Sequence, residues 1–222
     1  METRPGFFVS FEGLDGAGKS TQVAALGAAL RADGYDVLTV RPNDTPVGEL
    51  ISGVVLQHQL SASLQPWTEA LLFNAGRVQL LAEVILPALD AGTVVIADRY
   101  ADSTLAYQGG GRGLDPAALL RLHRDACDDV WPDLTVYLDL DHTIAVHRQH
   151  AQQLPLDRIE GAPSDFHARV HAAFDRLAAG DPTRIVRIDA GRPAVSVSQD
   201  VMRVVQERLR SVSAVSRPAV VR

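Results

Sequence analysis

A glycine-rich stretch near the N-terminus, FEGLDGAGKST over residues 11–21, restricts the possible folds of this chain more than any other segment. Four residues satisfy the pattern G-x-x-x-x-G-K-[ST]: Gly13, Gly18, Lys19 and Ser20. The pattern follows an apolar, strand-like run and precedes a helical one, which is the context that it requires. Backbone N–H groups of such a loop, together with the helix N-terminus, surround a chain of phosphates. The loop therefore predicts a nucleotide site at the edge of an α/β sheet.

Three side chains of this loop suggest how it would hold its ligand. Lys19 would place a positive charge at the β- and γ-phosphates, and Ser20 would be a ligand of Mg²⁺. Asp15 has two interpretations: a solvated turn residue, or a carboxylate beside the transferring phosphoryl group. For the loop as a whole, the alternative is a glycine-rich turn without a ligand. The pattern indicates nucleotide binding but does not select a reaction.

Strand-like apolar runs alternate with helical patterns along the chain. The expected strands are 7–12, 35–40, 93–98, 134–140 and 184–188. The expected helices include 19–33, 46–58, 67–90 and 164–179. Repeated β–α alternation favours a parallel sheet with helices on both faces. We therefore predict an α/β fold of three layers around a parallel five-stranded sheet.

Composition excludes several classes of protein. With 46% hydrophobic and 22% charged residues, the 222-residue chain can build a large core, and disorder is not expected. The net charge of −6 argues against nucleic-acid or anionic-membrane binding. Cys127 is the only cysteine, so an intrachain disulfide is excluded. No signal peptide is apparent and no segment is expected to approach the roughly 18 apolar residues of a membrane span, so we expect a cytoplasmic protein.

Two further segments supply residues for a second ligand. The run TVVIADRY ends with Asp98, Arg99 and Tyr100 at the carboxyl edge of the sheet, where open α/β sheets bind ligands. Phe73 and Arg77 lie four residues apart on one helix face, where they would stack on a base and bond its edge. The alternatives are a surface ion pair for the first two residues and a core position for Phe73. The chain lacks the Asn-Lys-x-Asp motif with which GTPases recognise guanine, and it is too short for a motor protein. A second ligand site beside the loop would therefore indicate a small kinase.

Five blocks together resemble the bacterial form of thymidylate kinase, in order and spacing, from about residue 7 to 210. They are FEGLDGAGKST (11–21), EALLFNAGRVQL (69–80), DRYADSTLAYQGGGRG (98–113), PDLTVYLDL (132–140) and LDRIE (156–160). The resemblance implies a P-loop kinase fold, with one nucleotide kinase domain over residues 1–212 and a lid at about 148–163. We expect residues 213–222 to form a disordered tail. The resemblance also implies ATP and Mg²⁺ as cofactors, and direct transfer of a phosphoryl group to dTMP, giving dTDP.

The same resemblance assigns roles to individual residues. The ATP phosphates would contact Gly13, Asp15, Gly16, Ala17, Gly18, Lys19, Ser20, Thr21 and Arg148. The dTMP would contact Asp15, Phe73, Arg77, Arg99, Thr104, Tyr107 and Gln108. Ser20 and Asp98 would hold Mg²⁺. The catalytic residues would be Asp15, Lys19, Arg99 and Arg158.

The chain departs from the family pattern after its second strand. The family usually reads T-R-E-P-G-G-T-P-x-G-E-x-I-R, whereas residues 39–52 read TVRPNDTPVGELIS. Val40 replaces an arginine, Arg41 replaces the glutamate, and Ser52 stands where an arginine grips the acceptor phosphate. A charge-assisted hydrogen bond between an arginine and a phosphate contributes roughly 1.5–3 kcal/mol to the free energy of binding. Its loss would weaken acceptor binding about tenfold to over a hundredfold, unless Arg41 acts as a substitute.

The lid departs as well, because it keeps only two arginines, Arg148 and Arg158. Arg158 is the candidate for stabilising transition-state charge. For Arg148, a solvated cation at a helix end is the alternative. Three hypotheses follow: a dTMP kinase, a kinase of the same fold for a modified or different deoxynucleoside monophosphate, or a weakly catalytic nucleotide-binding paralogue.

The resemblance also implies a homodimer, with long apolar helices packed across a twofold axis. The helical pattern 67–90 is apolar on more than one face, which agrees with such an interface. Burial of that helix by the sheet within one subunit would produce the same pattern. The expected partners are therefore a second copy of the chain and its small nucleotide substrates, with no nucleic acid or membrane.

Overall fold

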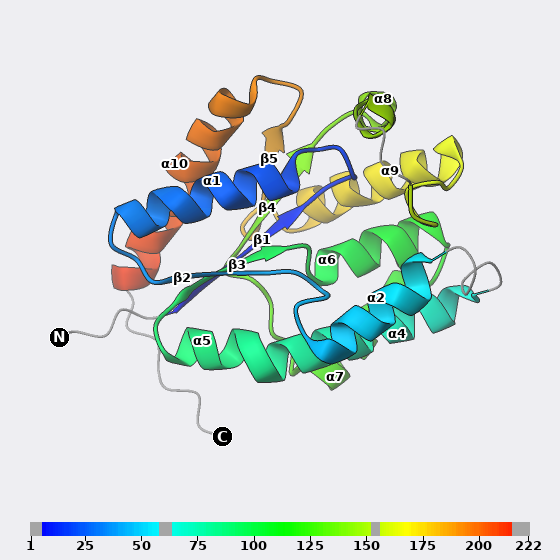
Figure 1. Ribbon diagram of the computed structural model, residues 1–222, viewed down its shortest axis with the longest axis horizontal. Coiled ribbons are helices and arrows are strands. Elements are labelled where there is room, and N and C mark those ends of the chain that lie inside the picture. The colour runs from blue at the N-terminus through cyan, green and yellow to red at the C-terminus, as the bar shows by residue number, and fades with distance from the viewer. Residues whose placement is uncertain (1–5, 58–63, 152–155, 215–222) are drawn as a thin grey trace.

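A sheet of five parallel strands forms the centre of the computed structural model, which describes residues 6–57, 64–151 and 156–214 (Figure 1). The strands are β1 (Phe7–Glu12), β2 (Val37–Val40), β3 (Val94–Asp98), β4 (Leu134–Asp139) and β5 (Ile185–Asp189). Their order across the sheet is β2-β3-β1-β4-β5. Every residue of β1 and β3 is buried, as expected for central strands of a parallel sheet. The predicted α/β fold is thus confirmed.

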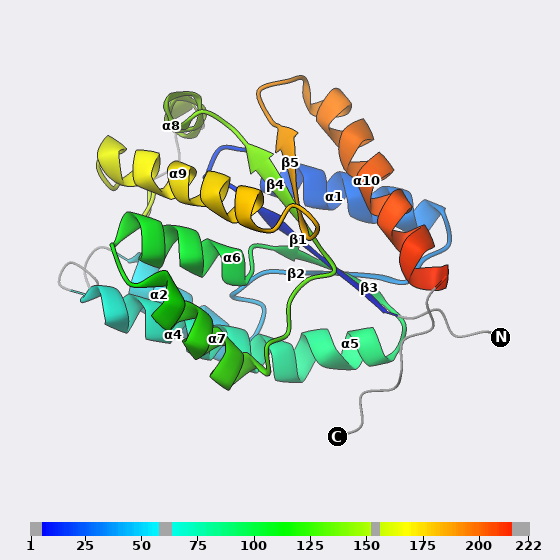
Figure 2. The ribbon, with the colours of Figure 1, turned by 180° about the vertical axis from the view of Figure 1, so that it is seen from behind.

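Helices cover both faces of the sheet, which makes the three layers. On one face lie α1 (Lys19–Ala32) and α10 (Ala194–Ala214), which contact each other. On the other face α5 (Leu86–Asp90) contacts β3, and α9 (Ser164–Gly180) contacts β5. The remaining helices are α2 (Pro46–Leu56), α4 (Pro66–Leu80), α6 (Ala101–Thr104), α7 (Pro116–Cys127) and α8 (His142–Ala151). Figure 2 shows α9 and α6 on this second side of the sheet, with α7 in front of α4, which it contacts.

The helix predicted over 67–90 runs from Pro66 to Asp90 and contains a π-helical segment, Leu81–Ile85, between α4 and α5. Its 25 residues and hydropathy of 1.3 would suffice to cross a membrane, so the expectation that no segment is so long and apolar is wrong. Its apolar residues include Ile85, which packs in one cluster with residues of β3. The same helix carries buried Glu69 and Arg77. This combination is typical of a core helix that also lines a polar site.

Three consecutive glycines, 109–111, bring α9 close to a second π-helical segment, Leu105–Gly111. A Cβ atom on Gly110 would lie 2.4 Å from Cβ of Ala173, and one on Gly111 would lie 2.4 Å from the ring of Phe166. Larger residues would therefore push α9 away. The close packing fixes the turn that carries Tyr107 and Gln108, and π-helical turns are frequent at functional sites.

Parallel pairing brings two distant loops together at the carboxyl edge of the sheet. Phe11 of β1 lies opposite Asp98 of β3, and the N–H of Arg99 donates to the Phe11 carbonyl at 3.0 Å. The glycine-rich loop and the start of α6 therefore lie side by side.

The expected ends of the domain are only partly described. α10 extends to Ala214, so the first two residues of the predicted tail 213–222 belong to a helix, and residues 215–222 lie outside the described ones. Residues 152–155 of the predicted lid also lie outside them. A single domain over residues 1–212 stays a prediction.

Candidate functional site

The loop between β1 and α1 has a backbone that only glycine adopts without strain. Gly13, Gly16 and Gly18 have φ values of 135°, 85° and 90°. A Cβ atom on Gly13 would lie 2.5 Å from the Leu138 carbonyl oxygen, so β4 approaches the loop closely. The first turn of α1 contains no acidic residue, which leaves its positive end open to an anion. The other predicted phosphate contacts, Ala17 and Thr21, lie in this loop and this turn.

Lys19, the only lysine of the chain, is enclosed by this loop. Its Nζ donates to the carbonyl oxygens of Gly13 at 3.3 Å and Leu14 at 2.9 Å, and to Oδ1 of Asp15 at 3.3 Å. Its side chain is buried, and burial together with the charge of Arg99 lowers the pKa of the ammonium group. A single buried cation thus lies within the curve of the loop.

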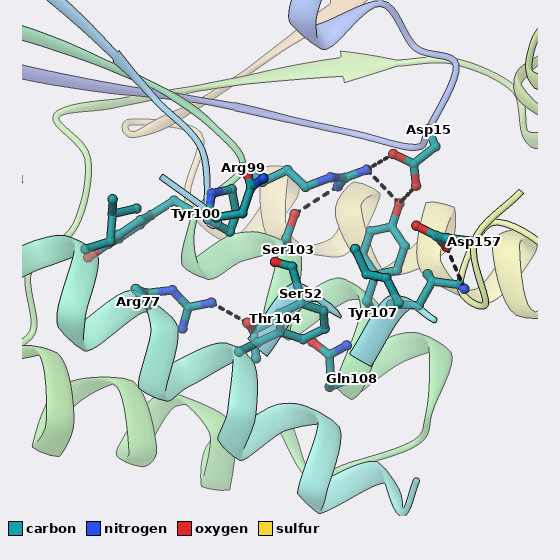
Figure 3. Close-up of a pocket in the computed structure, with 16 residues that line it drawn as sticks. Asp15, Ser52, Arg77, Arg99, Tyr100, Ser103, Thr104, Tyr107, Gln108 and Asp157 are labelled. Carbon is teal, nitrogen blue, oxygen red and sulfur yellow. Dashed lines mark hydrogen bonds and ion pairs between the residues drawn. The ribbon is translucent and has the colours of Figure 1, made fainter. Parts of the chain in front are cut away.

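Arg99 joins the loop to the neighbouring pocket (Figure 3). Its Nη1 donates to the Gly13 carbonyl at 3.1 Å and to Ser103 Oγ at 3.0 Å. Its Nη2 donates to Asp15 and, at 3.1 Å, to Tyr107 Oη. The backbone of Arg99 has φ 78°, a left-handed value that costs a non-glycine residue about 1–3 kcal/mol. Such strain persists where the surroundings hold the residue in place.

Asp15 is held as a carboxylate by two cations. Burial by itself would raise the pKa of Asp15, but the charges of Arg99 and Lys19 outweigh it and leave the pKa well below its ordinary value. Oδ2 of Asp15 also accepts a hydrogen bond from Tyr107 Oη at 3.1 Å. Asp15 is therefore an ion-paired residue at the border between loop and pocket, and the interpretation as a solvated turn residue is not supported.

Two side-chain oxygens meet at the other end of the loop. Ser20 Oγ, in the first turn of α1, donates to Asp98 Oδ2, at the end of β3, at 2.6 Å. The Asp98 side chain is buried and Ser20 is exposed. The two residues predicted to bind Mg²⁺ are thus brought together from positions 78 residues apart.

Beside Arg99 lies a cavity of about 260 Å³, close to the lower end of ordinary ligand pockets. The five other residues predicted to contact the acceptor all line it: Phe73, Arg77, Thr104, Tyr107 and Gln108. The guanidinium group of Arg77 donates to Asn74 Oδ1 at 3.0 Å and to Thr104 Oγ1 at 2.5 Å. It also lies over the Tyr100 ring, 5.5 Å from the centroid. The cavity therefore has an aromatic wall, an oriented guanidinium group and several hydrogen-bonding groups.

The two arginines of the predicted lid bond to groups outside the glycine-rich loop in this structure. Arg148 Nη1 donates to the Ala190 carbonyl, just after β5, at 3.2 Å. Arg158 donates through Nε to the Val55 carbonyl at 3.0 Å and through Nη2 to the buried carboxylate of Glu69. These contacts place the Arg158 guanidinium against α2 and α4.

Comparison with known proteins agrees with this geometry. The family model described as thymidylate kinase matches residues 11–201. The chain belongs to the thymidylate kinase family. It is 44% identical over 205 residues to the thymidylate kinase of Thermomicrobium roseum, covering 92% of this chain and 96% of that protein. It is 50% identical over 190 residues to the thymidylate kinase of Cereibacter sphaeroides, covering 83% of this chain and 87% of that protein.

A solved structure supports the same assignment. The crystal structure of thymidylate kinase from Ehrlichia chaffeensis matches with a TM-score of 0.73 and 30% sequence identity, covering 91% of this chain and 99% of that one. Members of this family are nucleoside monophosphate kinases, so the recognition and the enzyme class predicted from the sequence are confirmed.

The segment that departs from the thymidylate kinase pattern forms part of the pocket wall. Pro42, Asn43 and Ser52 line the cavity. Arg41 is exposed and does not line the cavity. Its N–H donates to Asp44 Oδ2 at 2.8 Å, which closes a turn at this point. In the described conformation, Arg41 does not take the place of the missing arginine.

Several residues of the site were not predicted individually, and four of them carry carboxylate or hydroxyl groups: Glu12, Glu69, Ser103 and Asp157. Glu12 accepts from the Tyr100 N–H at 2.7 Å and from Ser103 Oγ at 2.5 Å, and so holds the turn that carries Arg99. Burial, helped by the charge of Asp102, raises the pKa of Glu12 to about 7. The sequence offered a signal for two of these residues: Glu12 is an acidic residue at the end of an apolar strand, and Ser103 lies within the block DRYADSTLAYQGGGRG. Asp157 lines the pocket beside the lid arginine.

Proposed function

We propose that the protein transfers the γ-phosphoryl group of ATP to dTMP and produces ADP and dTDP. Membership of the thymidylate kinase family supports this reaction. One observation supports it most directly in this chain: Arg99 lines the acceptor cavity while its guanidinium group bonds to Gly13 and Asp15 of the loop. A phosphoryl group that passes from a nucleotide in the loop to an acceptor in the cavity would pass this cation.

The ATP phosphates would lie in the loop between β1 and α1. The N–H groups of the loop and the start of α1 favour anions there. The Lys19 ammonium would exchange its contacts with the carbonyls of Gly13 and Leu14 for the β- and γ-phosphates. Arg148 would contribute a further positive charge from the lid. The proposed contacts are Gly13, Asp15, Gly16, Ala17, Gly18, Lys19, Ser20, Thr21 and Arg148.

Ser20 and Asp98 fit a Mg²⁺ site that is completed by phosphates and water. A hydroxyl and a carboxylate are hard oxygen ligands, which Mg²⁺ prefers, and their oxygens lie 2.6 Å apart at the mouth of the loop. Few protein ligands are expected, because Mg²⁺ keeps several waters in nucleotide sites. When bound, the ion would neutralise charge on the β- and γ-phosphates.

The thymidylate would occupy the cavity. Phe73 would stack on the thymine ring, and Arg77, already oriented by Asn74 and Thr104, would bond the base edge. Gln108 and Thr104 would also face the base. Tyr107, fixed by Asp15 and Arg99, would crowd the sugar 2′ position and favour deoxyribose.

Positioning and charge neutralisation would carry the reaction, because phosphoryl transfer needs no covalent intermediate. Asp15, kept ionised by Arg99 and Lys19, would orient the acceptor. A catalytic role of Arg158 stays a prediction. To reach the transferring group, its guanidinium would have to leave Glu69 and Val55.

The decisive experiment is a kinase assay with ATP, Mg²⁺ and a panel of acceptors: dTMP, dUMP, dCMP, dAMP and dGMP. We expect dTMP to have the highest kcat/KM. In the same assay, Ser52→Arg should lower the KM for dTMP about tenfold or more. It would add a cation to the cavity wall, and a charge-assisted bond is worth roughly 1.5–3 kcal/mol.

Ser211→Arg is the matched control, since it adds the same charge at an exposed position of α10 and should leave the KM unchanged. A different preferred acceptor would favour a kinase for another deoxynucleotide, a possibility motivated by Ser52 and Asn43 in the cavity wall. Turnover far below about one per second on every acceptor would instead favour a nucleotide-binding paralogue.

We also propose that the protein is a cytoplasmic homodimer. Exposed large apolar residues gather on the neighbouring helices α2 and α4: Val47, Leu50, Val54, Trp67 and Leu71. Such a surface commonly forms a protein interface. Sedimentation velocity should show a dimer, and Leu50→Glu, at a residue 72% exposed, should shift it towards monomer. A monomeric wild-type protein at micromolar concentration would contradict the proposal.

A further inference from the structure

Glu69 is a buried carboxylate to which the proposed reaction steps assign no role. It lies on α4, one helical turn before Phe73, and its side chain is 1% exposed. A carboxylate in such a place persists only when cations and hydrogen bonds replace the lost water. Three side chains do so here: Gln108, Arg112 and Arg158. Burial would raise the pKa of Glu69, but these partners lower it below its ordinary value, so the group is ionised at neutral pH.

One oxygen of Glu69 fixes the orientation of Gln108. Nε2 of Gln108 donates to Oε1 of Glu69 at 2.8 Å. Because an ionised carboxylate only accepts hydrogen bonds, the amide nitrogen must face Glu69, and the amide oxygen is left for the cavity that Gln108 lines (Figure 3). An oxygen in this place would accept from the ring N3–H of thymine. Cytosine has no hydrogen at N3 and would present a second acceptor.

The other oxygen of Glu69 holds the lid segment 156–160. Oε2 accepts from the Arg158 guanidinium, whose Nε donates to the Val55 carbonyl at 3.0 Å. The N–H of Arg158 also donates to the Leu56 carbonyl at 3.1 Å. Arg158 is thereby fastened to the end of α2 and to α4.

This attachment shapes the cavity itself. Asp157 and Ile159, on either side of Arg158, both line the cavity. The Asp157 carboxylate accepts from the backbone N–H groups of Ile159 at 2.7 Å and Glu160 at 2.8 Å, which makes the segment a compact turn. Moving Arg158 would therefore move one wall of the acceptor site.

We propose that Glu69 is a positioning residue that acts on both base selection and the lid, through a different oxygen for each. One of its oxygens directs the Gln108 oxygen towards N3–H of the base, and the other anchors Arg158 so that the turn 156–160 closes the cavity. The inference rests on the proposed function, because it assigns this cavity to thymidylate. Glu69 would contact neither substrate and would act through Gln108 and Arg158.

The test is Glu69→Gln, which keeps the shape of the side chain and removes its charge. A neutral amide at this place accepts either orientation of Gln108, so the ratio of kcat/KM for dTMP to that for dCMP should fall about tenfold. Without the ion pair, trypsin should cleave the Arg158–Ile159 bond faster in the nucleotide-free protein, as followed by mass spectrometry. Glu83→Gln, an exposed position of the same long helix, should change neither readout.

Arg158→Lys separates the two effects. Lysine is still a trypsin site but has a single donor group, which cannot reproduce the fork that joins Val55 to Glu69. Cleavage should therefore rise while the dTMP to dCMP ratio stays within about twofold, because Arg112 still pairs with Glu69. Should Glu69→Gln not fold, Glu69→Asp serves with the same readouts.

A purely structural role would give a different result. Glu69→Gln would then lower Tm and change neither the acceptor ratio nor the cleavage rate, which overturns the proposal. Failure of the proposed function is distinguishable, because it would appear in the wild-type protein as an absence of dTMP phosphorylation. Faster cleavage of the variant would in that case still support the lid anchor, whereas unchanged cleavage would overturn it.

Discussion

Replacing Lys19 with alanine is expected to lower kcat for phosphoryl transfer to dTMP by about 10³-fold. The substitution removes the cation enclosed by the loop, and removal of a single preorganised donor at a site of developing charge commonly costs 10²–10³ in rate, with larger losses for a charged group. Lys19 is buried, and no other lysine exists in the chain to replace it. Steady-state release of ADP measures the effect.

The single lysine offers a readout that is independent of activity. A reagent selective for primary amines modifies only Lys19 and the N-terminal amine, which mass spectrometry of the peptides separates. ATP should slow the modification of Lys19, and dTMP alone should slow it less. The Tm of Lys19→Ala controls for folding, since the Gly13 and Leu14 carbonyls lose a donor. Activity of a folded variant within tenfold of the wild type would contradict the assignment of Lys19.

Replacing Arg99 with alanine should lower kcat by about 10³-fold and also raise the KM for dTMP. The guanidinium is the group that contacts the loop at Gly13 and lines the acceptor cavity, and an arginine beside a transferring phosphoryl group is worth 10³–10⁵ in rate. Arg99→Lys should recover only part of the loss. Lysine carries its donors on one nitrogen, so it cannot reproduce the spread of the planar guanidinium, whose Nη1 bonds Gly13 while Nη2 bonds Asp15 and Tyr107.

The same substitution should change the pH dependence of stability. Arg99 helps keep the folded-state pKa of Asp15 below its unfolded value of about 3.9. The stability contributed by this carboxylate is therefore present above about pH 4 and is lost as the pH falls below that value. The difference in Tm between wild type and Arg99→Ala should be largest near neutral pH and shrink in acid.

Arg203→Ala is the control for both readouts of the Arg99 variants, because its side chain is 61% exposed and pairs only with surface carboxylates. It should leave kcat within twofold and Tm nearly unchanged. An Arg99→Ala variant that keeps normal kcat, or a Tm difference that grows in acid, would contradict the roles given to Arg99 and Asp15.

The local parts of the fold and the site were accessible from the sequence because they depend on neighbouring residues. The loop needs only glycines at fixed spacing between a strand and a helix, and Gly13, Gly16 and Gly18 have the positive φ values that favour glycine. The strands were placed from apolar runs, although β2 begins only at Val37, two residues later than expected. Phe73 and Arg77 share a helix face by simple periodicity, and both line the cavity.

Other features were not predictable from local patterns. The helix Pro66–Asp90 contains a π-helical segment, Leu81–Ile85, which the expected helix over 67–90 did not include. The place of this π turn does not follow from apolar periodicity, since a π turn depends on the packing around it. The high hydropathy of the helix, by contrast, is a property of the sequence itself that the expectation of no membrane-length segment overlooked.

By itself, then, the sequence determined the parallel α/β architecture, the glycine-rich loop, the family and seven of the sixteen residues that line the cavity beside Arg99. Only the tertiary structure decided that Arg158 contacts Glu69 and that Ser52, and not Arg41, faces the cavity. Glu69 and Arg158 are 89 residues apart, and their pairing depends on how α4, α2 and the lid pack. A pattern of residue types records spacing along the chain, whereas the partner of a buried charge is selected by the three-dimensional environment that removes it from water.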